Sequence, residues 1–193
     1  MNWGNLTLWQ IELLPWYAFL IAWSIGLFWV KPVKTSEPFA ARLFTGLVVA
    51  AAFVLLFSQN WQPAVLRHRI WPASSPPEWT GIALTCAGAA IAIWARVILG
   101  ENWSAKVTLK TGHELVRSGP YAYVRHPIYT GLLLAIIGTT VEIGEWRGLP
   151  AIALVAIAHS LKARREEEFL MKEFGQEYQQ YRERTGSLVP RWH

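Results

Sequence analysis

Charge and cysteine are both scarce in this sequence. Charged side chains make up 16% of the 193 residues, against about 25% in a typical soluble domain. The single cysteine, Cys86, excludes an intrachain disulfide, a CxxC redox pair and a cysteine-built zinc cluster. Residues 1–10 contain no lysine or arginine, so they lack the basic segment of a cleaved signal peptide. We therefore expect the first apolar run to be retained as a membrane span.

The motifs of common soluble cofactor folds are missing as well. The sequence contains no GxGxxG, no P-loop, no HExxH and no GxSxG. A soluble-type nucleotide fold is therefore excluded, and we predict no metal site. The formal charge of +5 would suggest nucleic acid in a soluble protein, but here the bases lie between long apolar runs. This pattern indicates membrane orientation, with no nucleic-acid partner.

Long apolar runs are what the sequence has in abundance. Hydrophobic types make up 53% of it, and a helix needs roughly 20 apolar residues to cross a bilayer. The candidate spans are residues 13–30, 43–61, 79–99, 127–141 and 149–161. The last two are short and closely spaced, which predicts a tight helical hairpin whose second arm continues as helix beyond the membrane.

The basic residues predict the orientation of these spans. Fourteen of the eighteen lysines and arginines fall after the first, third and fifth spans, and three fall on the opposite side. Because basic loops stay in the cytosol, we predict an outside N-terminus and a cytosolic C-terminus. The predicted class is an all-α, polytopic membrane helical bundle of about five transmembrane helices, surrounded by membrane lipid. Its cytosolic C-terminal helical tail, residues 162–184, is interrupted at Gly175.

The candidate chemistry begins with the segment GPYAYVRHPIYTG, residues 119–131. Pro127 suits the first turn of a helix, which would place His126 at the cap beside free backbone N–H groups. Such a position attracts a carboxylate or phosphate. Gly131 would let another group approach the helix one turn further in. Each residue alone could be an interfacial anchor, but anchors need neither the proline nor the glycine, so the set favours a site.

A second cluster, Arg164-Arg-Glu-Glu-Glu168, follows the fifth span. Three successive carboxylates spread around a helix, so at least one should face the loop that holds His126. The alternative is a solvated helix laced with charge, which is the usual fate of such a run. His159 and Arg96 lie within spans, where charge is costly, and we assign them structural roles ahead of catalytic ones.

These two segments together resemble the isoprenylcysteine carboxyl methyltransferase family, whose pattern is shared by membrane phospholipid and thiol methyltransferases. The matching residues are Gly119-Pro-Tyr-x-x-Val-Arg-His-Pro-x-Tyr-x-Gly131 and Glu166-Glu167-x-x-Leu170-x-x-x-Phe174-Gly175-x-x-Tyr178-x-x-Tyr181. The resemblance covers about residues 100–190, including Asn102-Trp103-Ser104 before the first motif. We accordingly divide the chain into a three-span region, residues 1–99, and a catalytic region, residues 100–193.

The resemblance implies a methyltransferase that uses S-adenosylmethionine without a Rossmann domain. Carried over by position, the catalytic residues would be Arg125, His126 and Glu167, and the cofactor would also contact Tyr129, Gly131 and Glu166. We hypothesise that His126 holds the cofactor carboxylate and that the glutamates hold its ribose or amino group. Tyr123 or Tyr129 would face the sulfonium.

The methyl acceptor would be lipophilic and could enter sideways between the spans. A prenylcysteine carboxylate, a thiol and a phospholipid amine all remain open. The enzyme's main contribution would be alignment, which supplies roughly 7–11 kcal/mol in favourable cases. Two other functions compete with this interpretation, namely an NADPH-dependent sterol-type membrane reductase and a non-enzymatic membrane scaffold or transport component.

Overall fold

The computed structural model describes residues 8–26, 28, 33–36, 38–58, 62–72, 75–100, 108–110 and 115–191. The helices are α1 (Leu8–Gly26), α2 (Phe39–Phe57), η1 (Ala64–Arg67), α3 (Ser75–Leu99), η3 (Gly119–Ala122), α4 (Pro127–Ile143), α5 (Gly148–Phe174) and α6 (Gln176–Arg184). The strands are β1 (Val33–Ser36) and β2 (Thr108–Lys110). The predicted Asn102-Trp103-Ser104 segment, the ends of the first two predicted spans and residues 1–7 lie outside the described residues.

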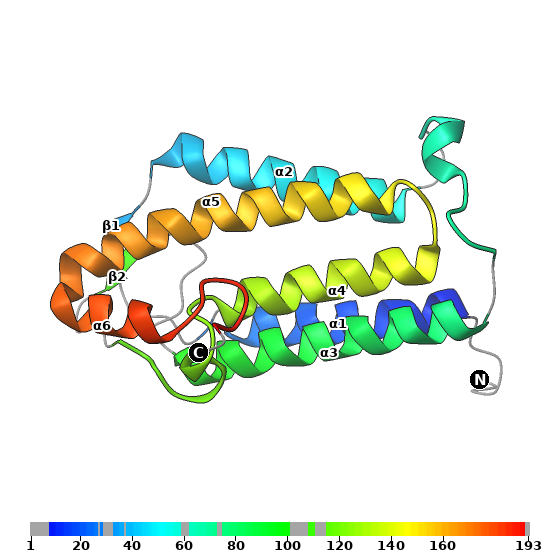
Figure 1. Cartoon of the computed structure of the whole chain (residues 1–193). Helices are drawn as coiled ribbons and strands as arrows, with labels where there is room; N and C mark the ends of the chain where they lie inside the picture. Colours follow the sequence, from blue (N-terminus) through cyan, green and yellow to red (C-terminus); the bar gives the residue numbers. More distant parts are fainter. Residues whose placement is uncertain are drawn as a thin grey trace.

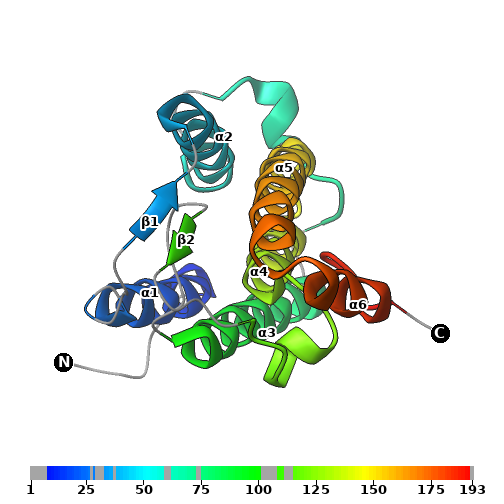
Figure 2. The same ribbon diagram turned by 90° about the vertical axis from the view of Figure 1, so that its left-hand side faces the viewer.

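The long helices form a bundle of two groups (Figures 1 and 2). In one group α1, α3 and α4 lie side by side, and in the other α2 runs along α5. The antiparallel β1–β2 ribbon, which the sequence analysis did not predict, lies between α1 and α2 at the α6 end of the bundle. The helical bundle is thus confirmed, with a short β ribbon added at one end.

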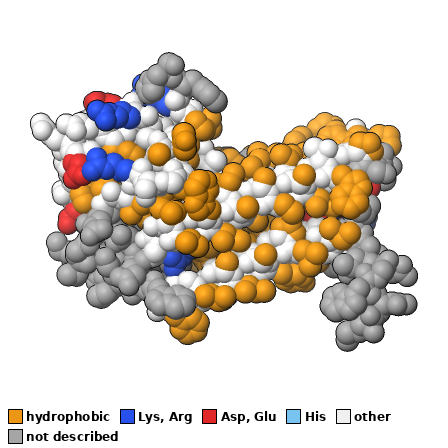
Figure 3. Space-filling view, turned by 90° about the horizontal axis from the view of Figure 1, so that it is seen from below, with side chains coloured by type: hydrophobic (Ala, Val, Ile, Leu, Met, Phe, Trp, Pro, Cys, Tyr) orange, Lys and Arg blue, Asp and Glu red, His pale blue; other side chains and the backbone are white. Residues whose placement is uncertain are grey.

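The exterior suits a bilayer. Hydrophobic side chains cover the middle of the face shown in Figure 3, and charged side chains gather at the α6 end. Of the described helices, α2 and α3 are long and apolar enough to cross a membrane, and α4 is a shorter apolar helix. The count of five spans and the orientation of the termini remain predictions.

Helices α3 and α4 pack unusually closely because glycines face each other across them. A Cβ added at Gly131 would lie 2.5 Å from the carbonyl oxygen of Gly88 and 2.7 Å from the nitrogen of Ala92. A Cβ at Gly138 would lie 2.4 Å from the nitrogen of Thr85. Small residues allow such backbone contact between helices in membranes, where packing replaces the hydrophobic effect. The close neighbour that the sequence predicted at Gly131 is therefore helix α3.

The α4–α5 hairpin and the long last arm match the prediction. Helix α4 ends at Ile143, and Gly144 closes it in the left-handed region with φ of 65°, a conformation that glycine adopts at little cost. Helix α5 then continues without a break to Phe174, well past the predicted span. Gly175, with φ of 50°, separates α5 from α6, as the sequence indicated.

Arg96 has the structural role expected of it. Its side chain is 5% exposed and donates to the carbonyl of Gly100 at 2.8 Å and to the carbonyl of Gly26. The C-terminal carbonyls of a helix have no partner within the helix. Arg96 therefore joins the ends of α1 and α3.

Candidate active site

The start of α4 is held in place by the chain that follows α6. Val124 pairs with Gly186 in a parallel bridge, and the backbone N–H groups of Arg125 and His126 donate to the carbonyls of Gly186 (2.9 Å) and Ser187 (3.1 Å). Thr130 Oγ1 donates to the carbonyl of Leu188 at 2.7 Å. The C-terminal segment thus fixes the backbone on either side of His126.

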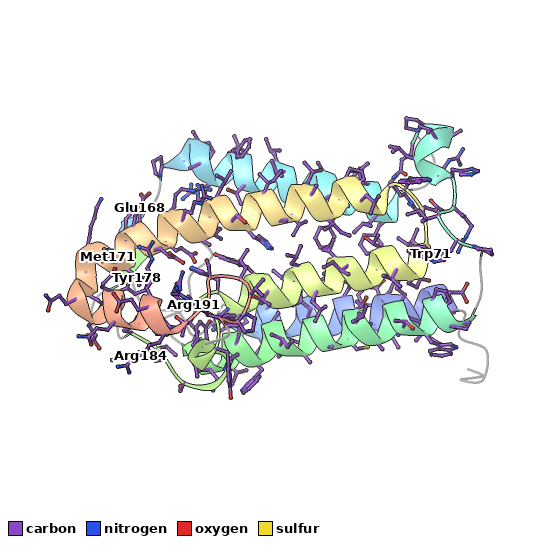
Figure 4. All side chains as sticks on the ribbon, viewed as in Figure 1. Trp71, Glu168, Met171, Tyr178, Arg184 and Arg191 are labelled. Atoms are coloured by element: carbon purple, nitrogen blue, oxygen red, sulfur yellow. The ribbon has the colours of Figure 1, made fainter. Side chains whose placement is uncertain are left out.

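His126 occupies the cap of α4, with Pro127 in the first turn, as predicted. Its ring is 6% exposed and lies between two carboxylates of α5. Nδ1 is 3.2 Å from Glu166 Oε2, and Nε2 is 3.2 Å from Glu167 Oε1. The prediction that at least one carboxylate of α5 faces this loop is confirmed for two of the three, whereas Glu168 is exposed (Figure 4).

Both carboxylates have further partners. Glu167 Oε1 accepts hydrogen bonds from Arg125 Nε at 2.9 Å and from Ser187 Oγ at 3.0 Å. Its Oε2 lies 3.8 Å from Arg182 Nε, on a side chain that is half exposed. Glu166 Oε1 accepts a hydrogen bond from the Tyr129 hydroxyl at 2.5 Å. Among the four carboxylate oxygens of Glu166 and Glu167, Oε2 of Glu167 therefore has the longest contact within the described part of the chain.

The close packing of these charges shifts their protonation. Burial by itself lowers the pKa of His126, but hydrogen bonds and attraction from Glu166 and Glu167 outweigh it and raise the pKa above 6.5. Burial raises the pKa of Glu167, but His126 and Arg125 outweigh it and lower the pKa to about 2. The pKa of Glu166 is also lowered, because His126 overcomes the effect of burial. The contacts within the cluster therefore favour the charged forms of His126, Glu166 and Glu167.

Tyr129 extends this network toward the bundle interior. Its ring stacks on His126, with the ring centroids 5.6 Å apart, and on His159 of α5, with the centroids 4.8 Å apart. Lys162 Nζ lies 5.6 Å from the centroid of the same ring. The tyrosine ring already receives a cation on its face, as a group suited to a positively charged ligand should.

The structure does not bring every predicted residue to the cluster. Tyr123 is 67% exposed, so its ring lies apart from the buried carboxylates, and its predicted cofactor contact remains a prediction. Gly131 has a packing reason of its own against α3, and its cofactor contact likewise remains a prediction. Both ring nitrogens of His126 contact protein carboxylates, and its predicted pairing with a cofactor carboxylate remains a prediction.

The sequence reasoning missed two contributors and underrated a third. Ser187 and the carbonyl of Thr185, to which Arg125 donates, lie past the last helix and had no motif to mark them. His159 was assigned a structural role, yet it stacks directly on Tyr129. Its seven-residue spacing from Glu166, two helical turns, is the signal that could have placed it on the same face of α5.

Aromatic side chains of α6 support the cluster from the α5–α6 turn. Tyr178 is fully buried, and Figure 4 shows it on the α6 segment that folds back beneath α5. The Tyr181 hydroxyl donates to the carbonyl of Tyr121 in η3 at 2.7 Å. Burial raises the pKa of Tyr181 to about 12, so this hydroxyl stays protonated and keeps donating. The tail tyrosines therefore tie α6 to the loop before α4.

Comparison with known proteins gives these residues a context. The sequence model of the isoprenylcysteine carboxyl methyltransferase family matches residues 81–173, which include both carboxylates and His126. The chain is 30% identical over 172 residues to protein-S-isoprenylcysteine O-methyltransferase B of Arabidopsis thaliana, covering 81% of this chain and 86% of that protein.

Two other relatives match different shares of the chain. Protein-S-isoprenylcysteine O-methyltransferase of Schizosaccharomyces pombe is 33% identical over 116 residues, 58% of this chain and 49% of that protein, so the chain spans about half of its length. Methanethiol S-methyltransferase of a Pseudomonas strain is 31% identical over 175 residues, 84% of this chain and 64% of that protein. The chain belongs to the isoprenylcysteine carboxyl methyltransferase family.

Proposed function

We propose that this chain is an integral membrane methyltransferase that moves the methyl group of S-adenosylmethionine to a lipophilic acceptor. The observation that carries the proposal is the ion network of Arg125, Glu166 and Glu167 around the buried His126, where α4 meets the distal half of α5. It stands at the charged end of a bundle whose flanks are apolar (Figure 3). A water-soluble cofactor and a membrane-dissolved acceptor can both reach such a boundary.

The donor groups present fit this cofactor. S-adenosylmethionine carries a sulfonium, an ammonium, a carboxylate and ribose hydroxyls. Glu167 Oε2 has the capacity to accept from an ammonium or hydroxyl, because its contact with Arg182 is long, at 3.8 Å. The Tyr129 face suits a cation. Arg182, half exposed beside Glu167, suits the cofactor carboxylate that we first assigned to His126.

The cofactor, when bound, supplies an electrophilic methyl group, and the protein contributes orientation. Arg125 and His126 fix the Glu167 carboxylate from two sides, at 2.9 Å and 3.2 Å, so its free oxygen keeps one direction. Tyr129 fixes Glu166 in the same way. Groups held this firmly lose little freedom when a ligand binds, which is the source of the rate gain from alignment. In this arrangement Arg125, His126 and Glu167 position the ligand rather than form a bond to it.

The acceptor classes follow from the relatives. The Arabidopsis thaliana relative is named for the isoprenylcysteine group and the Pseudomonas relative for methanethiol. Both names describe a sulfur-containing compound of low polarity, which matches entry from the apolar flank of the bundle. We extend this to a membrane acceptor reached between helices, in a chain of about five spans with its C-terminus in the cytosol. A phospholipid amine remains a further acceptor to screen.

The decisive experiment is binding of S-adenosylhomocysteine to the detergent-purified full chain by calorimetry. We expect saturable binding to the wild type and a loss of about 100-fold or more in Glu167→Gln, because that change removes the charge paired with Arg125 and His126. Glu168→Gln is the matched control, since Glu168 is exposed on the next position of the same helix. A folded wild-type protein that binds NADPH and ignores S-adenosylhomocysteine contradicts the proposal and favours a reductase.

A further inference from the structure

His159 is a buried polar side chain that the arrangement above does not use. It lies on α5 and is 6% exposed. Within the part of the chain that the structure describes, its Nδ1 is buried and has no hydrogen-bond partner. Leaving a ring nitrogen unpaired in such a place destabilises the fold. A buried polar group without a partner is therefore a candidate for contact with a ligand.

The position of His159 connects it to the site. Its ring stacks on Tyr129, which in turn stacks on His126. The three rings follow one another from the ion network to His159, which lies within the part of α5 predicted to span the membrane, residues 149–161. His159 thus stands at the membrane side of the site, which is the side from which a lipophilic acceptor arrives.

The charges around His159 distinguish the acceptor classes. Lys162 and Glu166 act on it from its own helix, and His126 acts on it from the cap of α4, with the Tyr129 ring between them. Among these groups the basic side chains of Lys162 and His126 outnumber the carboxylate of Glu166, so the surroundings favour an anion forming at the acceptor. An ammonium acceptor would add another cation to this surplus, which disfavours an amine.

The pKa values of the possible acceptors favour one class over the others. An ordinary imidazole has a pKa of about 6.5, a thiol about 8.5 and an alkylammonium about 10.4. Transfer from a thiol to an ordinary imidazole is uphill by about two pKa units. Transfer from an ammonium is uphill by about four units. A carboxylate acceptor is already ionised and needs no base, so an unpaired imidazole is matched to a thiol.

We propose that His159 is the general base for a lipophilic thiol acceptor, an inference that rests on the proposed methyltransferase function. The acceptor's S–H bond breaks, and its proton passes to Nδ1 of His159. The thiolate sulfur then forms a bond to the methyl carbon. The bond between that carbon and the sulfonium sulfur breaks, and its electron pair stays on the departing sulfur. The products are a methyl thioether, a neutral thioether cofactor and a protonated His159.

The test compares wild type with His159→Phe in the full-length protein. Phenylalanine keeps an aromatic ring against Tyr129 but has no nitrogen. We expect S-adenosylhomocysteine affinity within about twofold of wild type by calorimetry. With dodecanethiol as acceptor, we expect kcat at pH 7 to fall about 100-fold, the lower range for loss of a general base. His68→Phe is the matched control, because His68 is an exposed histidine at the opposite end of the bundle.

The pH profile separates a base from a packing residue. In His159→Phe only thiol that has ionised by itself can react, so its rate should rise about tenfold per pH unit toward the thiol pKa of about 8.5. The wild type should rise less steeply, because its base removes the proton. Equal slopes in the two proteins would contradict a role in proton removal, whatever the change in rate.

The remaining outcomes each decide a different point. A variant that methylates dodecanethiol at the wild-type rate, or that loses S-adenosylhomocysteine binding, overturns the role of His159 and leaves the methyltransferase proposal standing. The same holds if the wild type methylates the carboxylate of N-acetyl-S-farnesylcysteine but no thiol. A wild type that binds no S-adenosylhomocysteine overturns the proposed function itself.

Discussion

The two ends of the bundle each bury an arginine, and the two arginines meet different partners. At the end away from α6, Arg147 is 3% exposed, and its Nη1 donates to the carbonyls of Leu56 (2.8 Å) and Ser58 (3.3 Å). Gln62 donates to the carbonyl of the same Ser58 at 2.6 Å. Both side chains satisfy carbonyls at the C-terminus of α2, which have no partner within the helix. Arg147 also pairs with a carboxylate, because its Nε lies 2.7 Å from Oε2 of Glu145.

At the α6 end, Arg125 meets a carboxylate that several other side chains share. Its Nε and Nη2 each lie 2.9 Å from Glu167 Oε1, and its Nη1 donates to the carbonyl of Thr185. The carboxylate it holds is shared with His126 and Ser187. Arg125 thus belongs to a network in which several side chains share one carboxylate, whereas Arg147 closes a helix and pairs with Glu145 two positions before it.

The difference shows how to distinguish a structural buried charge from a functional one. Main-chain carbonyls at a helix end have fixed positions and carry no net charge, so an arginine bound to them has nothing to exchange with a ligand. Side-chain carboxylates can rotate, titrate and accept new donors. Perturbed, mutually dependent ionisable groups are accordingly more frequent at functional sites. Four predictions test this contrast, in order of expected effect.

Replacing each arginine by methionine should separate binding from stability. Arg125→Met leaves the Glu167 carboxylate without its main partner, a change that costs about 3–5 kcal/mol for a buried pair. We expect S-adenosylhomocysteine affinity to fall at least about 100-fold in calorimetry. Arg147→Met should lower the free energy of unfolding by about 3 kcal/mol, the loss of hydrogen bonds from a charged donor, yet keep the affinity within about twofold.

Arg147→Lys serves if Arg147→Met does not fold, because lysine keeps the charge and one donor. Thermal denaturation shows whether each variant is folded. If folded Arg125→Met and folded Arg147→Met lose S-adenosylhomocysteine binding equally, the two arginines do not differ in function.

Substituting Gly131 tests packing against ligand contact. In Gly131→Ala the new Cβ would lie 2.5 Å from the Gly88 carbonyl oxygen, so α3 and α4 must separate. Overpacking of this kind costs about 1–3 kcal/mol, visible as a lower midpoint of thermal unfolding in detergent. Gly138→Ala, at the equivalent contact further from the site, is the control. If Gly131→Ala alone weakens S-adenosylhomocysteine binding while both are equally destabilised, Gly131 contacts the cofactor as first predicted.

The ion network should respond to pH at both limits. The pKa of His126 is raised in the folded protein, so its charge stabilises the fold below pH 6.5, and that contribution is lost as pH rises through the raised value. Glu167 has a folded pKa of about 2, so its contribution is present above pH 4.5 and is lost as pH falls from 4.5 toward 2. Thermal unfolding midpoints across pH should therefore fall on both sides. Glu167→Gln should make the fall at low pH smaller, while the lowered pKa of Glu166 maintains part of it.

The smallest effect is expected at Glu168. Its side chain is exposed on α5, beside the two partly buried glutamates. Surface substitutions of this kind usually change stability by less than about 0.5 kcal/mol. Glu168→Gln should therefore bind S-adenosylhomocysteine within about twofold of wild type and unfold at the same temperature. A large loss would mean that all three carboxylates act together and that burial does not separate them.

Many of the helix boundaries could be predicted from short sequence patterns. Pro127 after His126 predicted the start of α4, because proline fits the first turn, and Gly175 predicted the break between α5 and α6. The apolar runs predicted the long helices to within a few residues at most ends. Helix α1 is the exception: it begins at Leu8 and includes Glu12, which is 1% exposed. A search for uncharged runs stops at such a residue, although neighbouring helices can shelter it.

The sequence by itself determined the helices, their apolar flanks and the residue types that meet at the α6 end, because these follow from periodicity, hydropathy and the preferences of proline and glycine. Only the tertiary structure decided which side chains touch. Glu166 and Glu167 both face His126, Glu168 does not, and His159 joins them through Tyr129. That choice depends on the angle and depth at which α4 and α5 pack and on the tail folding back over them. Contacts between residues forty positions apart in the chain set this geometry, and no local pattern records them.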